Sequence, residues 1–370
     1  MLPNTLTKFP IALFLRRKMS ASLIFNPDGL ISRIQTRLIT AFSKNLCDDL
    51  PLDTPRVVYL ETTNLCNYHC FYCPSGDNKL MKSKEVKRGY MTKDLFSKLV
   101  TDLASFPKKI PSVYLHLNGE PLLHKSIVDF VKILKSSSVT DSIRIITNGH
   151  LLDEKISESL IDAGLDMLIV SIEHIDNSGY KQVAKVDNGY TIVHQNVKKF
   201  NAIRRRKKSK MVVYAKIIKT LLSNEELHPF YSDFKDHVDI INVEQPYKQN
   251  NMDDDPTLTR QSGLNMHGLI KLQSERTVCP SPFFSLGVAY DGQVSPCCVD
   301  WSNEVNIGNA NNNSLLEIWE GVQLQTLKEK FLKGQKKDIP VCDACDYMQQ
   351  FSDCDELDNS KEILLNQYSH

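Results

Sequence analysis

The sequence predicts an α/β protein, a partial (β/α)6 barrel followed by a small C-terminal domain that combines a hairpin with a helix. Short β-prone apolar runs alternate six times with helical patterns between residues 53 and 250, which is typical of a parallel, barrel-like sheet. Further along, the turn pair Asp291-Gly292 separates two β-prone runs and predicts the hairpin, and one helix is expected over about residues 314–333. All but one of the ten cysteines fall into two groups, one in each of these regions.

The length favours more than one structural unit, because 370 residues and 42.1 kDa exceed an average domain. We expect an N-terminal helical extension over residues 1–52, an α/β core over 53–250, a polar linker or lid over 251–275 and the C-terminal domain over 276–370. Hydrophobic residues make up 41% of the chain and charged residues 24%, which excludes wholesale disorder.

Charge and hydropathy exclude several classes of partner. Lys and Arg number 45 against 44 Asp and Glu, so we expect no nucleic-acid partner and no anionic membrane surface. The apolar run Ile11–Leu15 is far shorter than the roughly 20 residues of a membrane helix. Basic residues follow this run instead of preceding it, which is the reverse of a secretory signal. We therefore expect a cytoplasmic protein with no membrane span.

The expected strands follow one another at regular intervals along the core. Helices are expected between the early strands over about 93–105, 127–135 and 154–163, the last of them ended by Gly164. In a parallel barrel the active groups lie where the strands end, at their C-terminal side. The six strands are expected at 57–60, 113–117, 143–147, 168–172, 212–218 and 238–243.

The first cysteine group directly follows the first expected strand. Cys66, Cys70 and Cys73 have C-x3-C-x2-C spacing, and three such thiolates can hold a cuboidal iron–sulfur cluster with one iron left free of protein ligands. A closed tetrahedral zinc site would need a fourth ligand, which His69 could supply. Both kinds of metal site are compatible with these residues alone.

At these residues the chain resembles the radical S-adenosylmethionine (SAM) superfamily, whose hallmark is C-x3-C-x-aromatic-C, with Tyr72 in the aromatic place. The resemblance implies a 4Fe-4S cluster on the three cysteines, whose free iron chelates SAM. It also implies a 5′-deoxyadenosyl radical that abstracts hydrogen from a C–H bond, and a flavodoxin or ferredoxin-like reductant. The cofactors carry the difficult chemistry in such enzymes, and the protein orients them.

Later motifs of the family stand at the ends of successive expected strands. Asn118-Gly119-Glu120-Pro121 occupies the place of the family's Gly-Glu motif, which receives the ammonium group of SAM. Asn148 and Ser171 end the third and fourth strands, where the family uses polar side chains for the ribose and carboxylate of SAM. Many relatives have Asp two residues after that Ser, whereas this chain has Glu173. The resemblance thus implies a SAM site of Tyr72, Asn118, Gly119, Glu120, Asn148 and Ser171.

The second cysteine group has the spacing that a four-thiolate cluster needs. The hairpin presents its middle ligand, and the order of motifs resembles the SPASM/twitch extensions of radical SAM enzymes, in particular 2-deoxy-scyllo-inosamine dehydrogenase-like proteins. We expect one auxiliary 4Fe-4S cluster there, and Cys298 and Cys354 as ordinary thiols, like the isolated Cys47. The expected ligands are Cys279, Cys297, Cys342 and Cys345.

These features favour a radical oxidoreductase that oxidises a small, sugar- or cyclitol-like substrate, with the auxiliary cluster as electron acceptor. A base for such a reaction is expected near the barrel mouth, where Glu173, Lys216 and Glu244 stand at expected strand ends. One alternative is a maturase that modifies a ribosomal peptide or protein. A further alternative is a non-catalytic zinc-binding module.

Overall fold

The computed structural model describes residues 45–244 and 276–368, apart from residues 344 and 352. The expected linker or lid over 251–275 and most of the expected N-terminal extension therefore lie outside the described residues. The described part of the extension, residues 45–52, contains the short 3-10 helix η1 (Cys47–Asp49).

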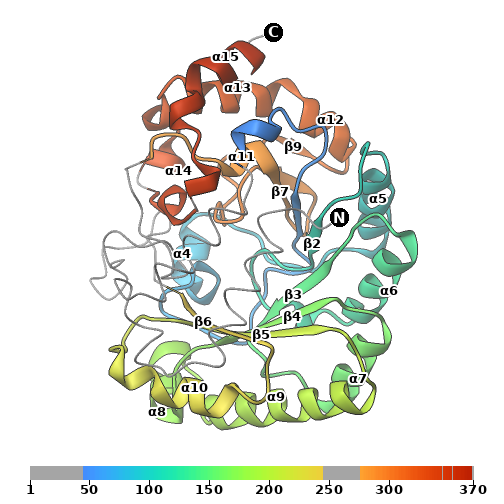
Figure 1. The fold of residues 1–370 in the computed structure, drawn as a ribbon, viewed down its shortest axis with the longest axis vertical. Helices are drawn as coiled ribbons and strands as arrows, with labels where there is room; N and C mark the ends of the chain where they lie inside the picture. Colours follow the sequence, from blue (N-terminus) through green and yellow to red (C-terminus); the bar gives the residue numbers. More distant parts are fainter. Residues whose placement is uncertain (1–44, 245–275, 344, 352, 369–370) are drawn as a thin grey trace.

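Nine strands form one continuous sheet in the order β6-β5-β4-β3-β2-β1-β7-β8-β9 (Figure 1). The first six run parallel, which confirms the predicted partial barrel. These six are β1 (Val57–Leu60), β2 (Ser112–Tyr114), β3 (Ile143–Thr147), β4 (Met167–Ile172), β5 (Val212–Ile218) and β6 (Ile240–Glu244). The other three, from the C-terminal part, are β7 (Ser285–Val288), β8 (Gln293–Ser295) and β9 (Gly308–Asn309).

Helices cover the outer face of the barrel, as Figure 1 shows for α5 to α9. Three of these helices, α5, α7 and α8, begin at side-chain caps: Thr92 accepts from the Leu95 backbone N–H, Asp153 from that of Ile156, and Asp176 from that of Gly179. The helices of the core are α4 (Asn78–Ser83), α5 (Lys93–Ala104), α6 (Ile127–Ser137), α7 (Glu154–Asp162), α8 (Asn177–Ala184), α9 (Gly189–Arg206) and α10 (His228–Phe234).

The C-terminal part contains α11 (Ser281–Phe284), α12 (Leu315–Glu320), α13 (Val322–Leu332), α14 (Pro340–Asp343) and α15 (Lys361–Tyr368). The single helix predicted over 314–333 is therefore wrong, because α12 and α13 are separate helices. Gly321 lies between them with extended backbone angles, φ −69° and ψ 151°, which end the first helix and begin the second. None of the helices among the described residues is long and apolar enough to cross a membrane.

Strand side chains alternate between two apolar layers. One set, which includes Val58, Val113 and Leu168, packs against the outer helices. The other set faces the inside of the barrel, here called the lumen, and its apolar part is Val57, Tyr59, Tyr114, Ile146, Met167, Ile169, Val212, Tyr214, Ile240 and Phe284. The lumen therefore has an aromatic floor, and polar side chains follow it toward the C-terminal ends of the strands.

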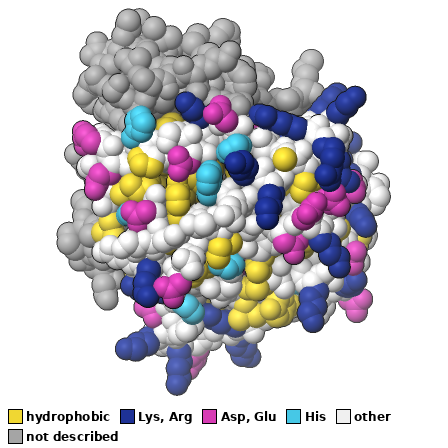
Figure 2. All heavy atoms as spheres, turned by 90° about the horizontal axis from the view of Figure 1, so that it is seen from below, with side chains coloured by type: hydrophobic (Ala, Val, Ile, Leu, Met, Phe, Trp, Pro, Cys, Tyr) yellow, Lys and Arg dark blue, Asp and Glu magenta, His cyan; other side chains and the backbone are white. Residues whose placement is uncertain are grey.

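The outer helices present a mixed surface to solvent. Figure 2 views the molecule from below and shows basic and acidic side chains interspersed over the described part of that face. The basic run at the end of α9 contributes to this mixture, because Arg206 pairs with Glu158 and Lys207 pairs with Asp162. Both ion pairs connect the end of α9 to one neighbouring helix, α7 (Glu154–Asp162).

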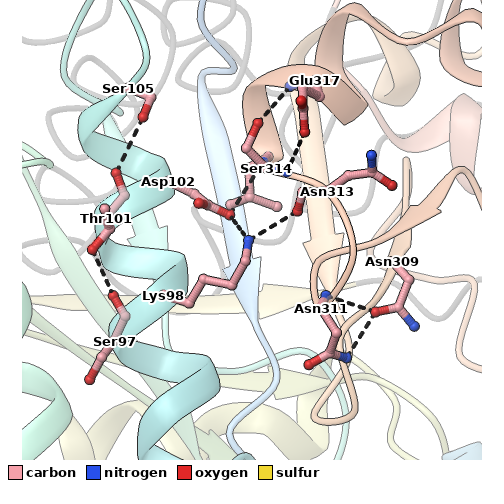
Figure 3. Close-up of polar contacts among 11 residues, drawn as sticks. Ser97, Lys98, Thr101, Asp102, Ser105, Asn309, Asn311, Asn313, Ser314 and Glu317 are labelled. Carbon is pink, nitrogen blue, oxygen red and sulfur yellow. Dashed lines mark hydrogen bonds and ion pairs between the residues drawn. The ribbon is translucent and has the colours of Figure 1, made fainter.

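A polar contact joins α5 of the core to α12 of the C-terminal part, as Figure 3 shows. The Asp102 carboxylate, which is 7% exposed, accepts from the Leu315 backbone N–H at 3.2 Å and from Lys98 at 2.8 Å. Lys98 also donates to the Asn313 carbonyl at 3.0 Å, and Ser314 caps α12 in a capping box with Glu317. The start of α12 is thereby fixed on the core.

We expect Asp102→Ala to lower the free energy of unfolding by about 1–3 kcal/mol, because it leaves a buried backbone N–H and a lysine without their acceptor. The measurement is urea unfolding of the anaerobically reconstituted protein. Asp129→Ala is the matched control, since Asp129 pairs with Lys93 at an exposed site, where such pairs contribute little. Equal effects of the two substitutions would contradict this account of the contact.

Candidate functional site

The three cysteines of the first group lie in a tightly wound loop after β1. The Cys73 N–H donates to the Cys70 carbonyl at 3.1 Å, and the Gly76 N–H donates to the Cys73 carbonyl at 2.9 Å. A Cβ on Gly76 would lie 2.6 Å from the Cys70 carbonyl oxygen, so only glycine lets the chain fold back so closely. The exposed His69 ring contacts the Gly76 carbonyl at 3.1 Å, which engages it in the turn of this loop.

The electrostatics of this loop favour neutral thiols in the absence of a metal. Burial, with a contribution from the Glu120 carboxylate, raises the pKa of Cys66 to about 12. Burial also raises the pKa of Cys70, with Glu173 as the next cause, and the pKa of Cys73. Iron ions bound there would supply the positive charge that makes these thiols thiolates. Three thiols at one strand end, one buried and two half-buried, fit an iron–sulfur cluster.

The loop after β2 packs directly on the cysteine loop. Gly119 has φ +72°, and a Cβ on it would lie 2.6 Å from the carbonyl oxygens of both Thr63 and Leu65. The Glu120 N–H donates to that same Leu65 carbonyl at 2.7 Å. The predicted Gly-Glu motif therefore adjoins the predicted cluster ligands in space.

The Glu120 carboxylate joins the ends of β2 and β3. It accepts from the Thr147 hydroxyl and the Asn148 N–H, both at 2.7 Å, and from the Leu122 N–H at 2.9 Å. Burial raises the pKa of Glu120 to about 7 despite these donors. Asn148 in turn donates to Asn67, between the first two cysteines, at 2.8 Å. Glu120 thus organises the loops around the cysteines, in addition to its expected contact with SAM.

Asn118 is held by a carboxylate that the sequence motifs did not single out. Its side-chain amide donates to Glu61 at 2.7 Å, and the other oxygen of Glu61 accepts from the Tyr290 N–H at 3.1 Å. Glu61 is 1% exposed, and burial raises its pKa to about 7. The sequence shows only that Glu61 directly follows a β-prone run. Its role could not be predicted from this position, because its partner Tyr290 lies 229 residues away in the sequence.

Five of the predicted polar residues lie together on the lumen side. The Tyr72 hydroxyl donates to Glu173, and Lys216 pairs with Glu244 at 2.8 Å. Burial raises the pKa of Glu173, while Tyr72 and then Lys216 oppose that effect. Ser171 lies two residues before Glu173 on β4 and is in register with Lys216 of β5. The structure thereby brings the three predicted bases to one end of the lumen.

His116 is a lumen residue that the sequence motifs did not reveal. It follows β2 two residues after Tyr114, close enough to Lys216 for the two charges to repel. Burial, and then this repulsion, lower the pKa of His116 to about 3, so the imidazole is neutral at physiological pH. In the sequence, His116 is marked only by its position in an expected strand. A histidine at such a position does not by itself indicate a functional role.

The second group of cysteines surrounds a cavity of about 40 Å³ in the C-terminal part. Its walls include all four predicted ligands, whereas Cys298 is not among the lining residues. Burial raises the pKa of Cys342 to about 12 and also raises that of Cys279. Among the described residues, no three His, Cys, Asp or Glu side chains are grouped closely enough to hold a single metal ion. Four thiols around a cavity are a donor set that fits a cluster.

Comparison with protein families agrees with this arrangement. Residues 60–217 match the radical SAM superfamily, and residues 279–346 match the SPASM iron–sulfur cluster-binding domain. The chain therefore contains a radical SAM domain and a SPASM domain. Its cofactors are accordingly SAM with a 4Fe-4S cluster, and auxiliary iron–sulfur in the SPASM domain.

The individual proteins that match this chain share a low sequence identity with it. A probable GTP 3′,8-cyclase of Methanococcus maripaludis is 25% identical over 308 residues, covering 77% of this chain and 95% of the relative. Streptococcus suis SuiB bound to precursor peptide SuiA is 14% identical with a TM-score of 0.57, covering 82% of this chain and 72% of SuiB. BtrN in complex with AdoMet and 2-DOIA is 19% identical with a TM-score of 0.49, covering 81% and 97% of the two chains. The likeness to SuiB shows a common fold, and the substrate has to be argued from the site itself.

We expect Gly119→Ala to weaken SAM binding roughly tenfold, about 1.4 kcal/mol, and to lower the iron content, because the new Cβ would collide with the backbone before Cys66. Anaerobic calorimetry and iron analysis measure the two effects. Gly334→Ala is the control: Gly334 has φ +73° but no atom within 4 Å of the new Cβ, so it shares only the backbone strain. Normal SAM affinity in Gly119→Ala would show that this close approach is not needed.

Proposed function

We propose that the protein is a radical SAM oxidoreductase that removes two electrons from a small hydroxylated substrate bound in the lumen. The observation that carries this proposal is the cavity bounded by four cysteines, Cys279, Cys297, Cys342 and Cys345. A cluster with a thiolate on every iron has no open position for a substrate, so electron acceptance suits it better than substrate ligation.

The first cysteine loop supplies the radical chemistry in this proposal. Cys66, Cys70 and Cys73 would hold the 4Fe-4S cluster, which together with SAM would supply the radical chemistry that removes a hydrogen atom from the substrate. Gly119 keeps the loop after β2 close to these cysteines, and Glu120 fixes the ends of β2 and β3 around them. Tyr72, Asn118, Asn148 and Ser171 complete the proposed SAM site.

The lumen side chains are proposed to bind the substrate and to take its proton. Oxidation of an alcohol to a carbonyl releases a hydrogen atom to the deoxyadenosyl radical, a proton to a base, and one electron to the auxiliary cluster. We assign the proton to the carboxylates of Glu173 and Glu244, which lie at this end of the lumen around Lys216, because the lowered pKa of His116 makes its imidazole a poor proton acceptor. Lys216 and the neutral imidazole of His116 are then proposed to hold the substrate hydroxyl groups.

The charges of the lumen favour a sugar- or cyclitol-like substrate over a nucleoside triphosphate. In the described part of the lumen, Lys216 is paired with Glu244, and Arg144 donates to the Tyr114 hydroxyl at 3.0 Å. A triphosphate needs several cations that are free to contact its oxygens. Neutral hydroxyl groups match this set of carboxylates, amides and imidazole better. A peptide substrate stays as the alternative, and a flavodoxin or ferredoxin-like protein as the proposed reductant.

The experiment is anaerobic reconstitution followed by substrate screening. Two 4Fe-4S clusters require about eight irons per chain, and dithionite with SAM should release 5′-deoxyadenosine. Sugars and aminocyclitols are then incubated with the enzyme, and mass spectrometry looks for products lighter by two hydrogens. Products from a peptide panel instead would support the maturase alternative, and zinc without iron would support the zinc module.

We expect Cys342→Ala/Cys345→Ala to keep about half of the wild-type iron and to form 5′-deoxyadenosine, because these cysteines lie in the SPASM domain and not in the SAM site. Oxidised product should be absent, since the electron lacks its acceptor. Iron analysis and product assays measure both effects. Cys354→Ala, which removes another thiol of the C-terminal part, is the control and should keep its full iron content. Unchanged iron in the double variant would contradict the second cluster.

A further inference from the structure

Among the described residues, Lys336 has the only basic side chain that lines the four-thiol cavity. It is half-buried and belongs to the short 3-10 helix η6 (Lys336–Asp338), which lies between α13 and α14 in the chain. Most of the remaining wall is apolar, with residues such as Leu327, Phe331 and Val341. A charge beside such a wall acts more strongly than a charge in water, because an apolar environment screens it less.

The ammonium group of Lys336 holds the turn that carries two of the four expected ligands. Its Nζ donates to the Asp343 carbonyl at 2.9 Å and to the Cys345 carbonyl at 3.0 Å. Carbonyls at the end of a helix lack a partner within it, and a nearby lysine can satisfy them, as Lys336 does at the end of α14. The turn itself is closed by the Cys345 N–H, which donates to the Cys342 carbonyl at 3.2 Å. Lys336 therefore stabilises the backbone that presents Cys342 and Cys345 to the cavity.

One acidic residue, Asp300, also lines the cavity. Its carboxylate is buried and accepts from the Val305 N–H at 2.8 Å, from the Glu304 N–H at 3.0 Å and from the Ser295 hydroxyl at 3.2 Å. These donors stabilise its negative charge within its own loop. A substitution of Lys336 leaves this loop unchanged, so the sign of its effect on the cavity depends on the lysine charge alone.

We propose that Lys336 is a positioning residue of the auxiliary cluster, whose ammonium group holds the turn of Cys342 and Cys345 and raises the reduction potential of the cluster. The inference rests on the proposed function, because it needs a cluster that the four cysteines hold and that accepts an electron.

The direction of the effect follows from charge. Reduction adds one negative charge to a cluster that four thiolates already make anionic, and net charge is one of the quantities that set its potential. A fixed cation beside the cavity stabilises the reduced form more than the oxidised form. Lys336 therefore favours transfer of the electron that the substrate radical gives up. Loss of its charge should lower the potential of the auxiliary cluster without removing a ligand.

The test is a redox titration of the anaerobically reconstituted protein, with iron analysis and with electron paramagnetic resonance of the auxiliary signal. Lys336→Gln removes the charge but keeps a side chain that can donate to a carbonyl, and it should lower the auxiliary midpoint potential. Lys336→Arg keeps the charge and should keep the potential close to that of the wild type. Both variants should form 5′-deoxyadenosine with dithionite as the wild type does, because the first cysteine group lies in another part of the chain.

Lys337→Gln is the matched control. Lys337 lies on the same helix η6, but it is exposed to solvent and does not line the cavity. The substitution makes the same change in net charge at a site where water and salt screen it, so the potential should not move. No shift in Lys336→Gln, or equal shifts in Lys336→Gln and Lys337→Gln, would overturn the proposal.

Loss of the auxiliary signal would also decide the matter. If Lys336→Gln loses the signal and Lys336→Arg keeps it, the charge is needed to hold the cluster, which supports the proposal. If both variants lose the signal, the lysine acts through its shape and not through its charge, and the proposal is overturned. Absence of the signal from the wild type would instead refute the proposed function.

Discussion

The structure depends on the fact that β1 is paired on both of its edges. β2 pairs with one edge from Val57 to Tyr59, and β7 pairs with the other from Val57 to Leu60. A strand of a barrel that is left open would otherwise present unpaired N–H and C=O groups. The parallel pairing with β7 places the SPASM hairpin at a fixed register beside the strand that leads into the cysteine loop. Both cysteine groups are thereby positioned by one short strand.

Glu61 extends this constraint beyond the strand. A buried carboxylate is tolerated because it is hydrogen-bonded, and here its two oxygens accept from Asn118 of the core and Tyr290 of the hairpin. The loop that carries the Gly-Glu motif is therefore linked through one side chain to the turn of the SPASM hairpin. A shift of the hairpin along β1 would break this link, so the SAM site and the auxiliary domain are mechanically connected.

The parts of this protein that the sequence could predict were those with local signatures. Six strands followed from β-prone runs, because each such run is complete within a short segment. The four cysteines chosen as ligands from their spacing line one cavity, and their role as ligands stays a prediction. β1 and β7 pair although more than 200 residues separate them in the sequence. The alternation of apolar residues does not indicate which strands pair along their edges. The sequence did not reveal the roles of Glu61 and His116 for the same reason, because the residues that surround them are distant in the sequence. Gly321 shows the converse, since a helical pattern continues across a residue whose backbone is extended.

The placement of the two cysteine groups would suit the proposed oxidation, in which a hydrogen atom and an electron leave the substrate for different acceptors. The cysteine loop lies beyond the C-terminal end of β1, whereas Cys297 lies beside its N-terminal half, because β8 runs antiparallel to β7. A substrate bound above the aromatic floor, as proposed, would face the first cysteine group across the strand ends and the second across the floor. If both centres met the substrate from the same side, the electron acceptor would compete with SAM for the reacting carbon. Opposite approaches would allow both of the proposed transfers within one lumen, with the proton taken by the carboxylates around Lys216.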